Sequence, residues 1–323
     1  MLRPTHASVR GFALAVVIAN AVIIATGEAV RLSSSGLGCP DWPQCTKTSV
    51  VAAHSAGQTT LNTWIEFGNR LLNFPLAAIA GLAFIACLCY KPDGQRRRDL
   101  VWLSAALPLG VVAQAVVGGI LVLTRLNPAV RSLHYLLSSA ILAAAVVLHV
   151  RVSEGSGPAR SLVRTDLRVL AALLVGVTAL MLAAGTVVTG TGPLAGTIVD
   201  AHGHRTTVPR YHFSLENVTQ MHADIGWFIG ALAVALVIGL RFSPAPRQAV
   251  RFGWLVLVGL GIQGIVGYTQ YFNHLPAGLV WVHVTSSVLL WIFVLRLYLA
   301  TRERIPLPAE PIAAPAEGCA VPA

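Results

Sequence analysis

The sequence predicts an all-α membrane protein with eight transmembrane helices. Its 323 residues are 55% hydrophobic and only 11% charged, which is far from the composition of soluble domains of this length. A helix needs about 20 apolar residues to cross a hydrocarbon core of about 30 Å, and the chain divides into segments of that length separated by polar, Pro/Gly-bearing or basic stretches. The expected spans are 11–30, 66–90, 99–123, 129–151, 166–190, 215–240, 249–270 and 277–300.

The first span is expected to stay in the protein as a helix. Its apolar run is long enough to cross a bilayer and lacks the small-residue cleavage site of a signal peptide. Most of the 23 lysines and arginines fall at the ends that would face one side of the membrane, and such an excess marks the cytoplasmic side. We therefore expect a multi-pass plasma-membrane protein with both termini in the cytoplasm. This asymmetry accounts for the net charge of +10, so no nucleic-acid partner is expected.

An internal repeat predicts two pseudo-symmetric four-helix bundles. QAVVGGILVLTRLNPAVRSLHYLLSS begins at Gln114 and QGIVGYTQYFNHLPAGLVWVHVTSS at Gln263, and each has V-G, a Pro-bearing turn, a histidine and a serine pair at matching places. IATGEAVRLSSSGLG resembles LAAGTVVTGTGPLAG more weakly. An even number of helices separates the halves, so they should be parallel repeats. The expected divisions are an N-terminal half over 11–151, a cytoplasmic linker over 152–165, a C-terminal half over 166–300 and a disordered cytoplasmic tail over 301–323.

Histidines lie inside the apolar segments, where polar side chains are costly and usually functional. His134, His222 and His283 each fall within about two turns of the expected outer end of a span. Asn69 holds the equivalent place in the second span, with Glu66 one turn earlier. These spans all run in the same direction, so the sequence predicts a polar site near the outer face in each half.

Iron is the occupant that this chemistry favours. Neutral imidazole is a strong iron ligand, and a four-helix bundle can aim side chains from facing helices at one centre. His222 and His283 therefore predict a bis-histidine haem in the C-terminal half, although a single buried histidine can instead bond a backbone carbonyl. In the N-terminal half, Asn69 is a poor ligand opposite His134. A haem there is expected to be five-coordinate, with the open position that oxygen chemistry needs.

Two further features of the outer side carry expectations. Glu66 shares a helix face with Asn69 and could relay protons to bound oxygen, or could instead form an ion pair with Arg70 at i+4. Cys39 and Cys45 lie in the first outside loop, where an oxidising compartment favours a disulfide; the alternative is a pair of reduced thiols.

Other outside histidines are weaker candidates. In VDAHGHR, Asp200, His202 and His204 could bind a divalent metal ion, but a solvated loop is the favoured interpretation. His54 could supply a missing iron ligand to the N-terminal half, although an ordinary surface position is again favoured.

Six motifs carry a resemblance to a known family: GLGCPDWPQC, the glutamate of EFGNR, HYLLSS, TGTGP, QMHADIGW and VWVHVTSS. Over about residues 11–300 the chain resembles haem A synthase, a family of eight-helix membrane proteins that convert haem O to haem A for terminal oxidases. The resemblance implies an oxygen-dependent oxidation of one haem methyl to a formyl group by successive hydroxylation. The roles that it implies are haem b ligands for His222 and His283, a substrate-haem ligand for His134, a catalytic carboxylate for Glu66 and an outside-loop pair for Cys39 and Cys45.

The chain departs from the family pattern at two places. The family usually has histidine where this chain has Asn69, and its loop often reads GPHAGD where this chain has GPLAGT, with Leu194 and Thr197. The first departure leaves bis-histidine ligation of the substrate haem open, while Glu66 stays in register.

The resemblance also implies partners, namely haem O, the enzyme that produces haem O, molecular oxygen, an unidentified electron donor and the lipid bilayer. Two other functions remain as alternatives: a dihaem cytochrome b-like electron carrier without chemistry on haem, and a transporter whose histidines and Glu66 relay protons. The difference between the halves at Asn69 favours the oxidising enzyme, because a pure electron carrier would more naturally keep histidine at both positions.

Overall fold

The computed structural model describes residues 4–53, 59–199 and 205–305, and the prediction of eight transmembrane helices is confirmed for this part of the chain. Eight helices here are long and apolar enough to cross a membrane, which makes the chain a multi-pass membrane protein. The second span is divided into two helices. The helices are α1 (His6–Leu32), α2 (Thr60–Leu71), α3 (Asn73–Cys89), α4 (Arg98–Leu123), α5 (Pro128–Val152), α6 (Thr165–Thr191), α7 (Leu215–Arg241), α8 (Arg247–Phe272) and α9 (Ala277–Ala300).

Short elements connect these helices. They are the 3₁₀ turns η1 (Pro92–Gly94) and η2 (Pro193–Ala195) and the strands β1 (Ala159–Ser161), β2 (Thr197–Val199), β3 (Arg205–Thr207) and β4 (Arg302–Arg304). β2 and β3 form one antiparallel hairpin, and β1 pairs antiparallel with β4.

The second span differs from its predicted bounds. From α4 onward the predicted ends agree with the structure to within about two residues, but α2 begins well before residue 66. Its N-cap is Thr59, whose hydroxyl accepts a hydrogen bond from the Asn62 backbone N–H at 3.2 Å. The helix is interrupted at Leu72, because Pro75 has no N–H to donate to the carbonyl of Leu71. The first turns of α2 are polar, so a search for long apolar segments does not find where this helix begins.

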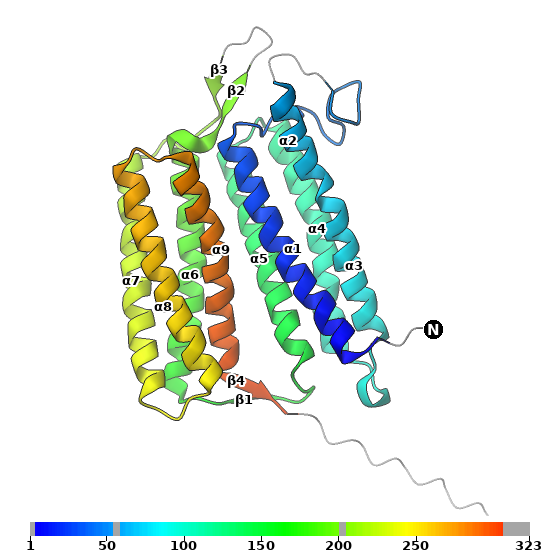
Figure 1. The fold of residues 1–323 in the computed structure, drawn as a ribbon, viewed down its shortest axis with the longest axis vertical. Helices are drawn as coiled ribbons and strands as arrows, with labels where there is room; N and C mark the ends of the chain where they lie inside the picture. The colour runs from blue at the N-terminus through cyan, green and yellow to red at the C-terminus, as the bar shows by residue number, and fades with distance from the viewer. Residues whose placement is uncertain (1–3, 54–58, 200–204, 306–323) are drawn as a thin grey trace, which may run out of the picture.

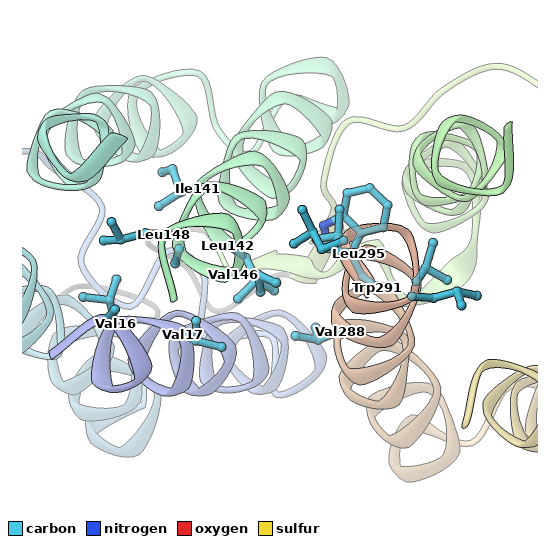
Figure 2. Close-up of a cluster of buried hydrophobic side chains, with 14 of the residues drawn as sticks. Val16, Val17, Ile141, Leu142, Val146, Leu148, Val288, Trp291 and Leu295 are labelled. Carbon is cyan, nitrogen blue, oxygen red and sulfur yellow. The ribbon is translucent and has the colours of Figure 1, made fainter. Parts of the chain in front are cut away.

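The helices form two groups that lie side by side (Figure 1). α1, α3, α4 and α5 pack around one another, as do α6, α7, α8 and α9. The groups meet where α1 contacts α9 and where α5 contacts α6 and α9. A continuous apolar core crosses this boundary. Figure 2 shows its members on α1, α5 and α9: Val16, Val17, Ile141, Leu142, Val146, Leu148, Val288, Trp291 and Leu295.

Two indole hydrogen bonds join the groups within the apolar boundary. The Trp291 Nε1–H donates to the carbonyl oxygen of Ser139 at 3.1 Å, and the Trp281 Nε1–H donates to that of Ala25 at 2.9 Å. Hydrogen bonds are directional, unlike apolar contacts, so these two bonds fix the position of α9 against α5 and α1.

The two ends of the bundle differ. One end, called here the loop end, carries residues 33–53, the start of α2, η2 and the β2–β3 hairpin; the opposite end carries the start of α1 and the β1–β4 pair (Figure 1). Residues 301–323 were expected to be disordered, but Arg302–Arg304 form β4, with Glu303 opposite Arg160. The Pro/Ala-rich composition of the segment beyond gave no sign of this pairing, and residues 306–323 lie outside the described part.

Candidate functional site

His222 and His283 face each other between α7 and α9. Their ring centroids are 6.4 Å apart and the ring planes are inclined by 64°. Two imidazoles on opposite sides of one metal ion, each with a metal–nitrogen distance of about 2.0–2.1 Å, have ring centres roughly 6 Å apart. The spacing therefore fits one iron held between the two rings, as the sequence predicts.

Glycines on the neighbouring helices make room for both rings. A Cβ at Gly185 on α6 would lie 3.2 Å from Cε1 of His222, and one at Gly267 on α8 would lie 3.3 Å from Cε1 of His283. Both distances are below an ordinary carbon–carbon contact of about 3.5–4.0 Å. The absence of a side chain at Gly185 and Gly267 is therefore what lets the imidazoles sit against these helices.

The other helix group has the same arrangement around His134 and Asn69. A Cβ at Gly118 on α4 would lie 3.2 Å from Cε1 of His134, and one at Gly27 on α1 would lie 4.0 Å from Nδ2 of Asn69. The four glycines occupy matching places in the repeated sequences, such as IATGEAV and LAAGTVV. Sequence reasoning noted these matches as part of the repeat but gave the glycines no role, although the match was the signal that could have identified them.

Buried polar atoms on all four of these side chains have no hydrogen-bond partner among the described residues. They are Nδ1 of His134, of His222 and of His283, and Oδ1 of Asn69. Native proteins leave few such atoms, and a bound ligand or ordered water commonly completes them. Because Nδ1 of each imidazole is buried against a glycine, Nε2 is the nitrogen that an iron could reach.

Two glutamines fix the helices that carry His134 and His283. Nε2 of Gln114 donates to the His134 carbonyl at 2.9 Å and to the Ser138 hydroxyl at 2.6 Å. Nε2 of Gln263 donates to the His283 carbonyl at 3.1 Å and also bonds a serine hydroxyl. The repeated glutamines thus hold α5 against α4, and α9 against α8, at the level of the histidines.

Glu66 is buried at the loop end and both of its carboxylate oxygens are occupied. Oε1 accepts from Nη2 of Arg70 at 2.6 Å and from its Nε at 3.1 Å, and Oε2 accepts from the Cys39 backbone N–H at 2.7 Å. Arg70 also donates to the carbonyls of Cys39, Asp41 and Gln44 at 2.7, 3.0 and 3.1 Å. The i+4 ion pair named as an alternative is therefore present, and it ties the first loop to α2.

The predicted Cys39–Cys45 disulfide is confirmed. Both cysteines are buried, and the loop that they close packs tightly on the helices. Gly38 lies so close to the Asn62 carbonyl that a Cβ would clash with backbone, and a Cβ at Gly119 on α4 would lie 2.5 Å from the Trp42 ring. The loop therefore packs tightly against α2 and α4 at the loop end.

Other residues are weaker candidates for metal ligands. Among the described residues, no group of three or more His, Cys, Asp or Glu side chains could hold a metal ion. Asp200, His202, His204 and the predicted loop residue His54 lie outside the described residues. In the departing loop, Leu194 is part of η2, and its carbonyl accepts from Nη1 of Arg31 at 2.5 Å.

The fold and site define an eight-span membrane protein with paired histidines inside one helix group. A comparison with protein families identifies it further: residues 10–295 match the COX15-CtaA model, described as a cytochrome oxidase assembly protein. The chain belongs to this family.

Curated relatives agree with the family. The chain is 30% identical over 115 residues to a heme A synthase of Geobacillus kaustophilus, which is 35% of this chain and 32% of that protein. It is 31% identical over 131 residues, 40% of each chain, to one of Lysinibacillus sphaericus, and 28% identical over 149 residues, 45% of each, to one of Bacillus cereus. The matches thus span less than half the length of these relatives.

Proposed function

We propose that the protein is a haem A synthase, which oxidises one methyl group of haem O to a formyl group with molecular oxygen. The observation that carries the proposal is the 6.4 Å spacing of His222 and His283 in a chain of this family. Each hydroxylation consumes dioxygen, two electrons and two protons and releases water, and loss of water from the doubly hydroxylated carbon leaves the formyl group. A membrane electron donor supplies the electrons.

The C-terminal half, 166–300, would hold a haem b cofactor through Nε2 of His222 and His283. Bound there, haem b supplies one-electron transfer, for which two axial imidazoles are suited. Gly185 and Gly267, which make room for the two rings, support this assignment. The halves would be parallel repeats, with 152–165 as the linker and the loop end at the outer face of the plasma membrane, because the opposite end collects most of the basic residues.

The N-terminal half, 11–151, would bind haem O through His134. Asn69 occupies the place of a second histidine, and its amide leaves the opposite face of the substrate open to molecular oxygen. The matching glycines beside His134 and Asn69 support a ligand at this depth. The difference between the two halves favours chemistry on one haem over simple electron transfer between two.

Glu66 is the carboxylate that we propose to be essential. Its bonds to Arg70 and to the Cys39 N–H support a role in holding the disulfide loop above the substrate. Proton delivery by Glu66 would require the pair with Arg70 to open. Proton delivery requires an ionisable carboxyl group, whereas a glutamine oxygen can still accept from the Cys39 N–H, so Glu66→Gln tests proton delivery.

Haem extraction tests the function directly. Cells that express the chain together with a haem O source are extracted, and the haems are separated by chromatography and identified by mass. A formyl-bearing product that is absent with His134→Ala is expected. Recovery of haem O unchanged from cells that contain the folded, haem-loaded protein would instead favour the alternative function, a dihaem electron carrier.

A further inference from the structure

Arg131 is a half-buried cation close to the proposed substrate site, and no contact described so far explains it. It lies on α5, three residues before His134 and therefore one turn nearer the loop end on a neighbouring face. Its Nη2 donates to the carbonyl oxygen of Leu126 at 2.7 Å. Its Nη1 is buried and has no partner among the described residues. A buried guanidinium N–H without a partner is costly unless an anion completes it.

The surroundings of Arg131 are also basic. Arg31 on α1, together with Arg210 and Tyr211 before α7, lies close enough to act on its charge, and Glu28 is the carboxylate nearby. Within the described ranges, neither Arg131 nor Arg210 forms an ion pair with a carboxylate, whereas Arg31 pairs with Glu28.

Neighbouring contacts hold the cluster in place. Nη1 of Arg31 and Nη2 of Arg210 donate to successive carbonyls of η2, those of Leu194 at 2.5 Å and Pro193 at 3.1 Å. The Tyr211 hydroxyl lies 3.2 Å from the Ser132 hydroxyl, on the residue next to Arg131. Backbone and hydroxyl groups therefore fix the side chains around Arg131 before any ligand arrives.

We infer that Arg131 is a substrate-recognition residue, which binds a propionate carboxylate of the haem held by His134. The inference rests on the proposed function. A haem carries two propionates on one edge, and a carboxylate on a guanidinium forms short, charge-assisted and often bidentate hydrogen bonds. Because Arg131 lies one turn from His134, a propionate of a haem bound by His134 could accept a hydrogen bond from the free Nη1 donor. An anionic lipid headgroup has related chemistry and is the rival source of the anion.

Binding of two probe haems tests the inference without relying on turnover. Full-length protein with its C-terminal site loaded is placed in phosphatidylcholine nanodiscs and titrated with ferric protoporphyrin IX or with its dimethyl ester. We expect the wild type to bind the diacid roughly tenfold or more tightly than the ester, as for a charged hydrogen bond. Arg131→Gln should remove this difference, and Arg131→Lys should keep part of it.

Arg125→Gln is the matched control, because Arg125 is exposed near the same end of α5 and should leave the preference for the diacid unchanged. The low-spin spectrum of the C-terminal haem reports folding of each variant. A diacid preference that survives Arg131→Gln in folded protein would overturn the inference. So would a loss of co-purified phosphatidylglycerol from Arg131→Gln, measured before reconstitution, with unchanged haem binding, which would make the anion a lipid headgroup.

The same titration separates this inference from the proposed function. His134→Ala should abolish binding of both probes at the second site. If the diacid preference depends on Arg131 but cells make no formyl haem, the recognition site stands and the proposed function fails. If formyl haem is made while Arg131→Gln still prefers the diacid, the function stands and the recognition site fails.

Discussion

Replacing Gly185 with valine should displace His222 and break the bis-histidine site. A Cβ at Gly185 would already lie 3.2 Å from Cε1 of His222, so alanine requires the ring to withdraw by a few tenths of an ångström to reach an ordinary contact. Valine places two methyl groups about 1.5 Å beyond Cβ, and the ring must then move by on the order of 1 Å. Overpacking of this kind costs about 1–3 kcal/mol, which corresponds to roughly 5- to 150-fold weaker binding of the C-terminal haem.

Gly176→Val is the matched control, because Gly176 lies on the same helix and a Cβ there would meet nothing within 4 Å. Both substitutions change the intrinsic helix propensity of α6 equally. The assay is haem content and the ratio of low-spin to high-spin absorption after purification and competition with apomyoglobin. We expect Gly185→Val to lose low-spin haem, Gly185→Ala to lose less than about tenfold in affinity, and the control to be unchanged. Equal retention of haem by Gly185→Val and Gly176→Val would refute the claim that the absence of a side chain at Gly185 makes room for His222.

Substitutions at three other residues test the remaining groups. Glu66→Ala should abolish haem A formation while the low-spin C-terminal haem persists, and normal product from this variant would mean that Glu66 is dispensable. Glu66→Gln should keep activity only if the carboxylate serves mainly to hold the Cys39 N–H. Asn69→His should add a second low-spin component to the spectrum, and an unchanged spectrum would argue that Asn69 does not face the substrate iron. Cys39→Ser should lower the free energy of unfolding by about 2 kcal/mol, as expected for a short closed loop. Thermal denaturation measures this loss, and the wild type reduced with dithiothreitol should show a similar one.

Much of the framework could be predicted because membrane spans depend on length and apolarity alone. The spans from α4 to α9 match their expected ranges, and the histidines of α7 and α9 meet as their repeat-related positions suggest. The start of α2 could not be placed in this way, because Thr60 and Asn62 are polar and the apolar run begins later. Its end at Leu71 follows from Pro75, whose effect is local and visible in the sequence.

Features that depend on backbone partners were beyond sequence reasoning. Arg70 bonds three loop carbonyls besides Glu66, and carbonyls leave no pattern in side-chain identity. The β1–β4 pair places Arg160 opposite Glu303, which is far away in the sequence, and three-residue strands are too short to show alternation. Arg131 donates to the carbonyl of Leu126, which is another backbone partner that side-chain identity does not indicate.

The central claim is that one haem iron lies between His222 and His283. Electron paramagnetic resonance of the purified ferric protein tests it most directly, with His222→Ala and His283→Ala measured beside the wild type. The account predicts a low-spin signal of bis-imidazole type in the wild type and its loss in each variant. A low-spin signal that survives both substitutions unchanged in folded protein would contradict it.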